Sequence, residues 1–103
     1  MKSFLVALTL ASAPATQATI DEYCLEIGNT AENVMQARQD GAALSSLIAL
    51  LEGRENTEFH RFLMITAYDR PRYGDPSMQR REIQDFRNEV ESACFRRFLD
   101  DRN

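Results

Sequence analysis

The chain has 103 residues, of which 27% are charged, and its formal net charge is −4. This acidic balance disfavours nonspecific binding to nucleic acid, which requires a basic surface. The length suffices for one small domain whose core is limited in size. We therefore expect a single domain, stabilised by a covalent cross-link, with no nucleic-acid partner.

A signal peptide is predicted over residues 1–18. Lys2 gives a positive start, an apolar run follows, and small residues ending at Ala15 or Ala18 offer two cleavage sites. The apolar run is shorter than the roughly 20 residues that span a bilayer, so we expect no membrane span in the mature chain. Residues 19–103 would form the exported domain, periplasmic or secreted, with 11 arginines against 16 acidic residues and a net charge of −5.

Cys24 and Cys94 are the only cysteines. An even pair in an oxidising compartment predicts a disulfide, and the CxxC spacing typical of redox-active thiols is absent. The bond would close a loop of about 70 residues, which in the chain-entropy model stabilises the fold by about 4 kcal/mol.

The first helix is predicted to begin with a capping box, because Thr19 stands three residues before Glu22. Apolar residues then recur at steps of three and four as far as about Arg38. Gly41 ends the helix, since glycine adopts the left-handed conformation without penalty. The predicted apolar face consists of Ile20, Cys24, Ile27, Ala31, Val34 and Met35.

Two shorter helices follow. The spacing of leucines and isoleucine predicts a helix over about 42–52, stopped by Gly53. Thr57 is the expected N-cap of a third helix that runs to about Tyr68. That helix must end before Pro71, which disfavours helical conformation in the preceding residue.

The fourth helix is the longest periodic run, over 78–98, and Asp75-Pro76 is a start signal for it. Its apolar face consists of Ile83, Phe86, Val90, Ala93, Cys94 and Phe98. No strand pattern occurs, so the predicted fold is an all-α bundle of about four helices. A Cys24–Cys94 bond would make helices one and four antiparallel, with facing residue numbers summing to about 118.

We call the segment between the third and fourth predicted helices the third connection. Arginines and tyrosines in and near it form a predicted binding surface for an acidic protein partner or another anionic ligand, because arginine binds carboxylates and phosphates in a bidentate manner. The surface consists of Tyr68, Arg70, Arg72, Tyr73, Arg80, Arg81 and Arg87. The alternative is a solvated charged surface. Arg38 and Arg87 interrupt apolar faces. Either they line a partly buried anion site, or their stems pack on the core edge while their heads reach water or a carboxylate such as Asp69 or Asp85.

Phe95 and Leu99 lie away from the main apolar stripe of the fourth helix. Either the third helix or the chain end covers them, or they form an interface for a homodimer or another partner. Catalysis is not expected, because His60 is the only histidine and lacks metal-ligand spacing, and no serine stands in a nucleophile motif. We therefore predict no catalytic residues, no metal site and no cofactor.

Three segments together resemble a group of small, uncharacterised exported helical proteins of proteobacteria and their phages and prophages. They are Met35-x-x-Arg38-Gln39-x-Gly41, then Ala67-Tyr68-x-x-Pro71-Arg72-Tyr73, then Asp85-Phe86-Arg87-Asn88 with Cys94. The resemblance implies a setting, the periplasm of a Gram-negative cell, and no mechanism. In size and plan the chain also resembles small disulfide-linked helical chaperones of the acid-stressed periplasm. The sequence thus predicts an exported, non-enzymatic protein-binding domain, with an acid-stress chaperone as the alternative.

Overall fold

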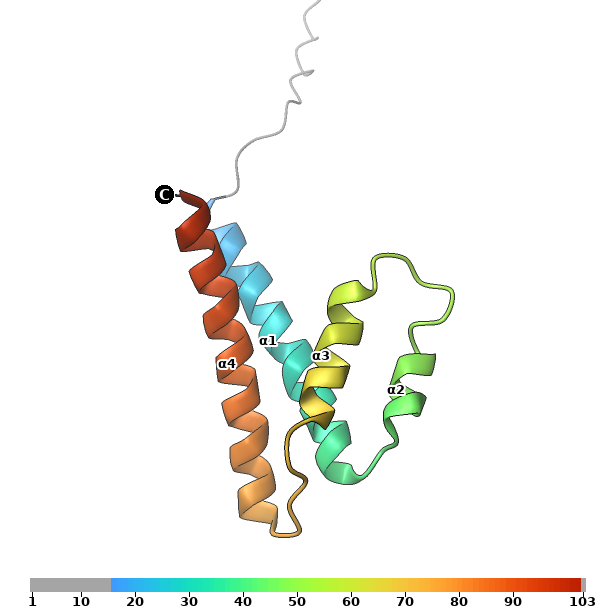
Figure 1. Ribbon diagram of the computed structural model, residues 1–103. Coiled ribbons are helices and arrows are strands. Elements are labelled where there is room, and N and C mark those ends of the chain that lie inside the picture. The colour runs from blue at the N-terminus through green and yellow to red at the C-terminus, as the bar shows by residue number, and fades with distance from the viewer. Residues whose placement is uncertain (1–15, 103) are drawn as a thin grey trace, which may run out of the picture.

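Four helices make up the described part of the chain (Figure 1). The computed structural model describes residues 16–102, with side chains to residue 99. The helices are α1 (Gln17–Asp40), α2 (Leu44–Ala49), α3 (Glu58–Tyr68) and α4 (Pro76–Arg102). No strand occurs within this range, so the predicted all-α class with four helices is confirmed. Most of the predicted signal peptide lies outside the described residues.

The long helices α1 and α4 pack side by side, and the last turns of α4 lie near the start of α1 (Figure 1). The predicted disulfide between Cys24 and Cys94 is present, with the Cα atoms 5.6 Å apart. Further along the pair, Arg87 donates to Glu32 across 2.5 Å.

The start of α1 differs from the prediction. The helix begins at Gln17, and its N-cap is Thr16, whose hydroxyl oxygen accepts a hydrogen bond from the backbone N–H of Thr19. The predicted cap at Thr19 was wrong because Thr16 offers the same side-chain acceptor one turn earlier. The predicted end is confirmed, since Gly41 has a φ of 92° and its N–H bonds to carbonyl groups of the last turn.

Helix α2 is shorter than the predicted range of 42–52. Ala43, just before it, has an extended backbone with ψ of 141°, which delays the start to Leu44. After Ala49 the chain continues in tight turns closed by bonds between residues three apart, such as Arg54 N–H to the Leu51 carbonyl. The apolar spacing still holds, because Leu47 and Leu51 are both buried.

The other predicted caps are confirmed in position. Thr57 precedes α3, although its side chain makes no capping bond. Asp75 precedes Pro76, and a carboxylate oxygen of Asp75 accepts from the N–H of Met78 at 3.3 Å. The Ser77 hydroxyl donates to the same carboxylate and lowers the pKa of Asp75. Asp75 therefore starts α4 as a charged cap.

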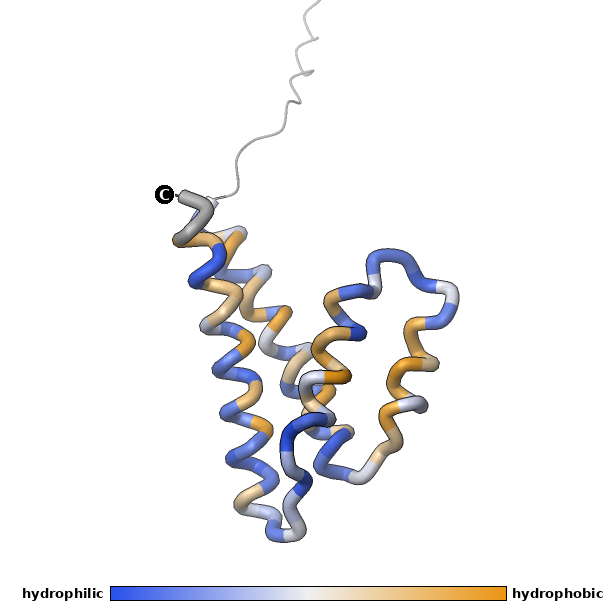
Figure 2. Tube along the Cα trace, viewed as in Figure 1, coloured by the Kyte–Doolittle hydropathy of each residue, from blue (hydrophilic) through white to orange (hydrophobic). Residues whose placement is uncertain are grey.

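The core lies where the second half of α1 meets α2, α3 and the first half of α4. It is formed by Ala31, Val34, Met35, Leu47, Leu51, Leu63, Met64, Ala67, Ile83 and Phe86. Ala93 was predicted to belong to the apolar core face of the fourth helix, but it is exposed. Figure 2 shows apolar colouring through α2 and α3, while α4 alternates apolar and polar residues. The apolar stripe of α4 thus extends beyond the core that covers it.

Candidate functional site

An apolar groove of about 740 Å³ lies between α1, α3 and α4. We call it the apolar groove throughout. Its walls are mostly aromatic and aliphatic. They are formed by Ile20, Tyr23 and Ile27 of α1 with Thr19, by Phe59, Phe62, Leu63 and Thr66 of α3, and by Phe86, Glu89, Val90, Ala93, Cys94, Arg97 and Phe98 of α4. This size and lining are typical of binding sites in proteins.

The groove exists because only the C-terminal part of α3 packs against the core. Leu63, Met64 and Ala67 in its C-terminal part are buried against the core. Nearer its start, Phe59 and Phe62 remain 41% and 63% exposed. In Figure 1 the start of α3 stands apart from the upper ends of α1 and α4. No other helix covers the apolar faces left between them in the described structure.

The disulfide holds the other wall together. Cys24 is fully buried, and Cys94 lines the apolar groove. The ring of Tyr23 packs edge-on against the ring of Phe98, with centroids 6.0 Å apart. The disulfide therefore cross-links α1 and α4 in the part of the groove wall that α3 does not cover.

A second, smaller hollow of about 230 Å³ lies beside the first, at the end of α4. It is lined by Gln17, Ile20, Phe95, Phe98 and Leu99. Phe95 is half-buried, whereas Leu99 is 60% exposed, so the third helix does not cover this edge. The role of Phe95 and Leu99 as an interface stays a prediction.

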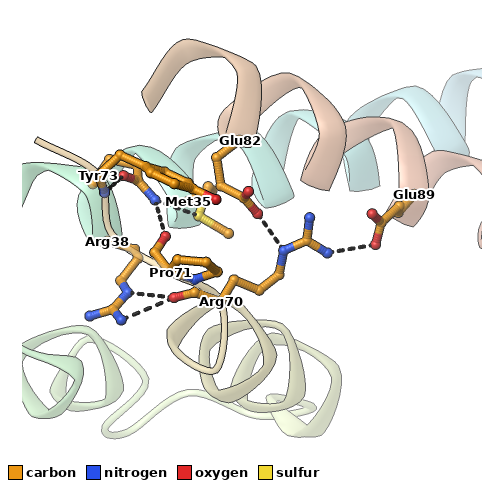
Figure 3. Close-up of polar contacts among 8 residues, drawn as sticks. Met35, Arg38, Arg70, Pro71, Tyr73, Glu82 and Glu89 are labelled. Atoms are coloured by element: carbon orange, nitrogen blue, oxygen red, sulfur yellow. Dashed lines mark hydrogen bonds and ion pairs between the residues drawn. The ribbon is translucent and has the colours of Figure 1, made fainter. Parts of the chain in front are cut away.

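The connection between α3 and α4 is fixed by the last turn of α1. Gln39 is only 1% exposed, and its amide group donates to the carbonyl of Pro71 at 2.8 Å and accepts from the N–H of Tyr73 at 2.9 Å. The guanidinium of Arg38 donates twice to the carbonyl of Arg70, as Figure 3 shows. The connection is thereby positioned by side chains of α1.

Arg70 joins this connection to α4. Its guanidinium pairs with Glu82 and, at 2.7 Å, with Glu89 (Figure 3). It also lies 5.4 Å from the ring centroid of Phe86, a cation–π distance. Hydrogen bonding to Glu89 is the largest influence that raises the pKa of Arg70. Because Phe86 and Glu89 line the apolar groove, these contacts of Arg70 fix the N-terminal end of its α4 wall.

Tyr68 and Arg38 are also engaged within the fold. The Tyr68 hydroxyl donates to the carbonyl of Ala42 at 2.6 Å, and the Arg38 guanidinium lies 5.0 Å from the Tyr68 ring centroid. Burial raises the pKa of Tyr68, and the charge of Arg38 partly offsets this. Arg72 donates to the backbone carbonyl of Gln39 at 3.0 Å. Tyr68 thus holds the end of α3 to the segment after α1, and Arg72 holds the third connection to α1.

Arg87 lies over α1, away from Arg38. It pairs with Glu32 and with Glu91 at 3.2 Å, so its carboxylate partners are not the predicted Asp69 or Asp85. Hydrogen bonding to Glu91 is the largest influence that raises the pKa of Arg87, and bonding to Glu32 adds to it. Arg38 and Arg87 therefore do not share an anion site.

Of the predicted binding surface, Arg80 and Arg81 remain exposed and form no ion pair within the described residues. Tyr73 is half-buried, and its backbone is bound to Gln39. The seven predicted residues are thus divided among the third connection, the start of α4 and the contact with α1. A binding role for them stays a prediction.

Residues 16–102 hold no group of three or more side chains suited to bind a metal ion. His60 is exposed and packs edge-on against Phe59. In the same part of the chain, none of the helices combines the length and apolarity needed to cross a bilayer.

Sequence reasoning did not identify the apolar groove. One signal for it was the aromatic pair Phe59 and Phe62 at the start of the third helix, which adds a second apolar face there. The other was Tyr23 beside the main stripe of α1. Comparison of the chain with protein-family models, curated proteins and solved structures finds no match.

Proposed function

We propose that this protein is an exported, non-enzymatic domain that binds another protein, and that the apolar groove receives an amphipathic helix of that partner. The observation that carries the proposal is the apolar groove itself, a hollow of about 740 Å³ with an aromatic and aliphatic lining. Large apolar surfaces left open on a small domain are typical of interaction sites.

The dimensions of the groove favour a helical ligand. Its α4 wall extends from Phe86 to Phe98. At 1.5 Å per residue this wall is roughly 18 Å long, which equals about three turns of a bound helix. Helices bind such grooves through apolar side chains at positions i, i+3, i+4 and i+7. The open end at Phe59 and Phe62 would let the helix enter sideways.

Export is supported by the disulfide, because disulfides persist in oxidising compartments. The signal peptide, cleavage after Ala15 or Ala18, and a periplasmic setting in a bacterium or its prophage belong to the same proposal. So does an antiparallel arrangement of α1 and α4, which the pairs Cys24–Cys94 and Glu32–Arg87 favour.

Affinity capture from periplasmic extract tests the location of the site. The substitution Phe62→Ser should abolish capture of the partner, because it removes the most exposed aromatic ring of the groove. Leu25→Ser is the matched control, since Leu25 is 49% exposed on α1 and does not line the groove. Reductant should weaken capture by loosening the α1–α4 wall.

The double substitution Arg80→Ala with Arg81→Ala tests the arginine surface in the same experiment. We expect it to leave capture unchanged. Capture that survives Phe62→Ser but is lost in the arginine variant would contradict the groove and favour the surface predicted from the sequence.

An acid-stress chaperone is the second proposal, favoured by the ion pairs that link the elements. Glu32 and Glu91 hold Arg87, and Glu82 and Glu89 hold Arg70. Below about pH 4 carboxylates become protonated while arginines stay charged, so these links weaken and the domain repels itself. Circular dichroism with an apolar dye tests this: a compact protein that binds no dye at pH 3 would contradict it.

A further inference from the structure

Three aromatic rings that line the apolar groove are largely exposed in the isolated domain. Tyr23, Phe59 and Phe62 are 53%, 41% and 63% exposed. With about 200 Å² for each aromatic side chain, they leave roughly 300 Å² of apolar surface in water. A standard interface buries about 800 Å² per partner, of which just over half is apolar. The rings alone approach two thirds of that apolar area.

The charges of the groove are arranged symmetrically along α4. Among the described side chains, Glu89 and Arg97 are the only charged ones that line it, and each lies four residues from Ala93. At 1.5 Å per residue, each charge is about 6 Å from Ala93 along the helix. Glu89 also pairs with Arg70, but its side chain is 60% exposed. Arg97 forms no ion pair with side chains described as far as residue 99.

We propose that the apolar groove binds the groove of a second copy of this chain, across a two-fold axis that passes close to Ala93. A two-fold axis brings the same patch of both copies together, so residue 93+n of one α4 faces residue 93−n of the other. Arg97 of each copy then faces Glu89 of the other. Opposite charges at equal distances from Ala93 can therefore pair across such an axis.

The small side chain at the centre fits this arrangement. Ala93 is exposed and lines the groove, so it does not hinder the approach of a second α4 to the 8–10 Å that separates packed helices. Phe62 of each copy would then lie in a shared apolar space. A helix of another protein would also fill the groove, but only a second copy necessarily places a carboxylate, that of Glu89, opposite Arg97.

Sedimentation equilibrium of the purified protein tests the interface by charge reversal. Arg97→Glu places two carboxylates opposite each other, and Glu89→Arg places two guanidinium groups opposite each other. Like charges in an interface oppose association, so each variant alone should dimerise at least 100-fold more weakly than the wild type. An equimolar mixture of the two variants should recover dimers, because every facing pair is then opposite in charge.

Arg96→Glu is the matched control, since Arg96 is exposed on α4 beside the groove and should leave the dimer unchanged. Leu99→Ser tests the rival interface at Phe95 and Leu99, and should also have no effect. Far-UV circular dichroism must show that Glu89→Arg, which loses its contact with Arg70, is still helical. A wild type that is monomeric at all concentrations, or folded charge variants whose mixture stays monomeric, would overturn the proposal.

Dimerisation through this groove rests on its assignment as the binding surface proposed above. A second copy and the helix of another protein would compete for the groove, and the two claims can fail separately. A monomeric wild type that still captures a partner dependent on Phe62 would overturn the dimer and leave the proposed function. A dimer that responds to both charge variants, together with capture that survives Phe62→Ser, would support the dimer and contradict the groove as the site that binds another protein.

Discussion

Replacing Gln39 of α1 with leucine should destabilise the domain, because its side chain holds the connection between α3 and α4. The side chain is 1% exposed and uses both ends of its amide, toward the Pro71 carbonyl and the Tyr73 N–H. Leucine has nearly the same size but leaves both backbone groups without these partners. Each lost partner costs about 1–3 kcal/mol, and the lower half of that range applies because Pro71 is exposed and Tyr73 only half-buried.

The expected loss is therefore about 2–3 kcal/mol of unfolding free energy after the added apolar burial is taken into account. For a domain of this size that lowers Tm by roughly 10–20 °C. Urea unfolding followed by far-UV circular dichroism measures the difference. Gln36→Leu is the matched control on the same helix, because Gln36 is exposed and bonds only to Asp40, and it should change stability by less than about 0.5 kcal/mol.

A Gln39→Leu variant as stable as the Gln36→Leu control would refute this reasoning. It would mean that water replaces the amide at Pro71 and Tyr73, and that other contacts position the third connection.

Three further predictions concern other parts of the fold. Reducing the disulfide should lower the unfolding free energy by about 4 kcal/mol, measured by urea titration with and without reductant. The free energy of unfolding should decline as pH rises above 10.0, because Tyr68 has a raised pKa in the folded state and its proton is needed for the bond to Ala42. The Tyr68→Phe variant should be about 1 kcal/mol less stable at neutral pH. Its stability should also decline less above pH 10.0 than that of the wild type. Gly28→Ala should destabilise the wild type, since a Cβ there overlaps the Glu91 side chain, but stabilise a Glu91→Ala background by about 0.5–1 kcal/mol through helix propensity.

The ends of the helices were largely predictable from local chemistry. Gly41 and Asp75 act on the backbone within a few residues, so their effect can be read from the sequence alone. The disulfide followed from the count of two cysteines. The error at Thr19 arose because Thr16 offers the same side-chain acceptor one turn earlier. The errors at the ends of α2 arose because Ala43 has an extended backbone and the chain forms tight turns after Ala49.

The roles of individual polar residues could not be predicted, because they depend on which segments meet in space. Arg70 and Arg72 were expected to face a partner, but they bind Glu82, Glu89 and the backbone of α1. Gln39 was not predicted as a site residue, although its side chain bonds to the third connection, 32 to 34 residues away. Periodicity shows which face of a helix is apolar, but not which helix will cover it.

The apolar groove is the clearest example of that limit. Val90, Ala93 and Phe98 belong to the predicted core face of the fourth helix, and the spacing is correct. Yet they line the apolar groove, because only the C-terminal half of α3 is buried against the core and its start does not cover this part of α4. The position of α3 is set by its contacts with α1 and by the short third connection, which no local pattern reveals.

The most direct test of the groove is a single fluorophore placed in it. The chain contains no tryptophan, so Phe62→Trp introduces one indole in the groove. Leu50→Trp is the control, because Leu50 is exposed at the end of α2 and does not line the groove. As protein concentration rises, emission from position 62 should shift to the blue and become protected from a soluble quencher, while emission from position 50 stays unchanged. An indole at position 62 that remains open to the quencher at every concentration, and with the captured partner added, would contradict the account.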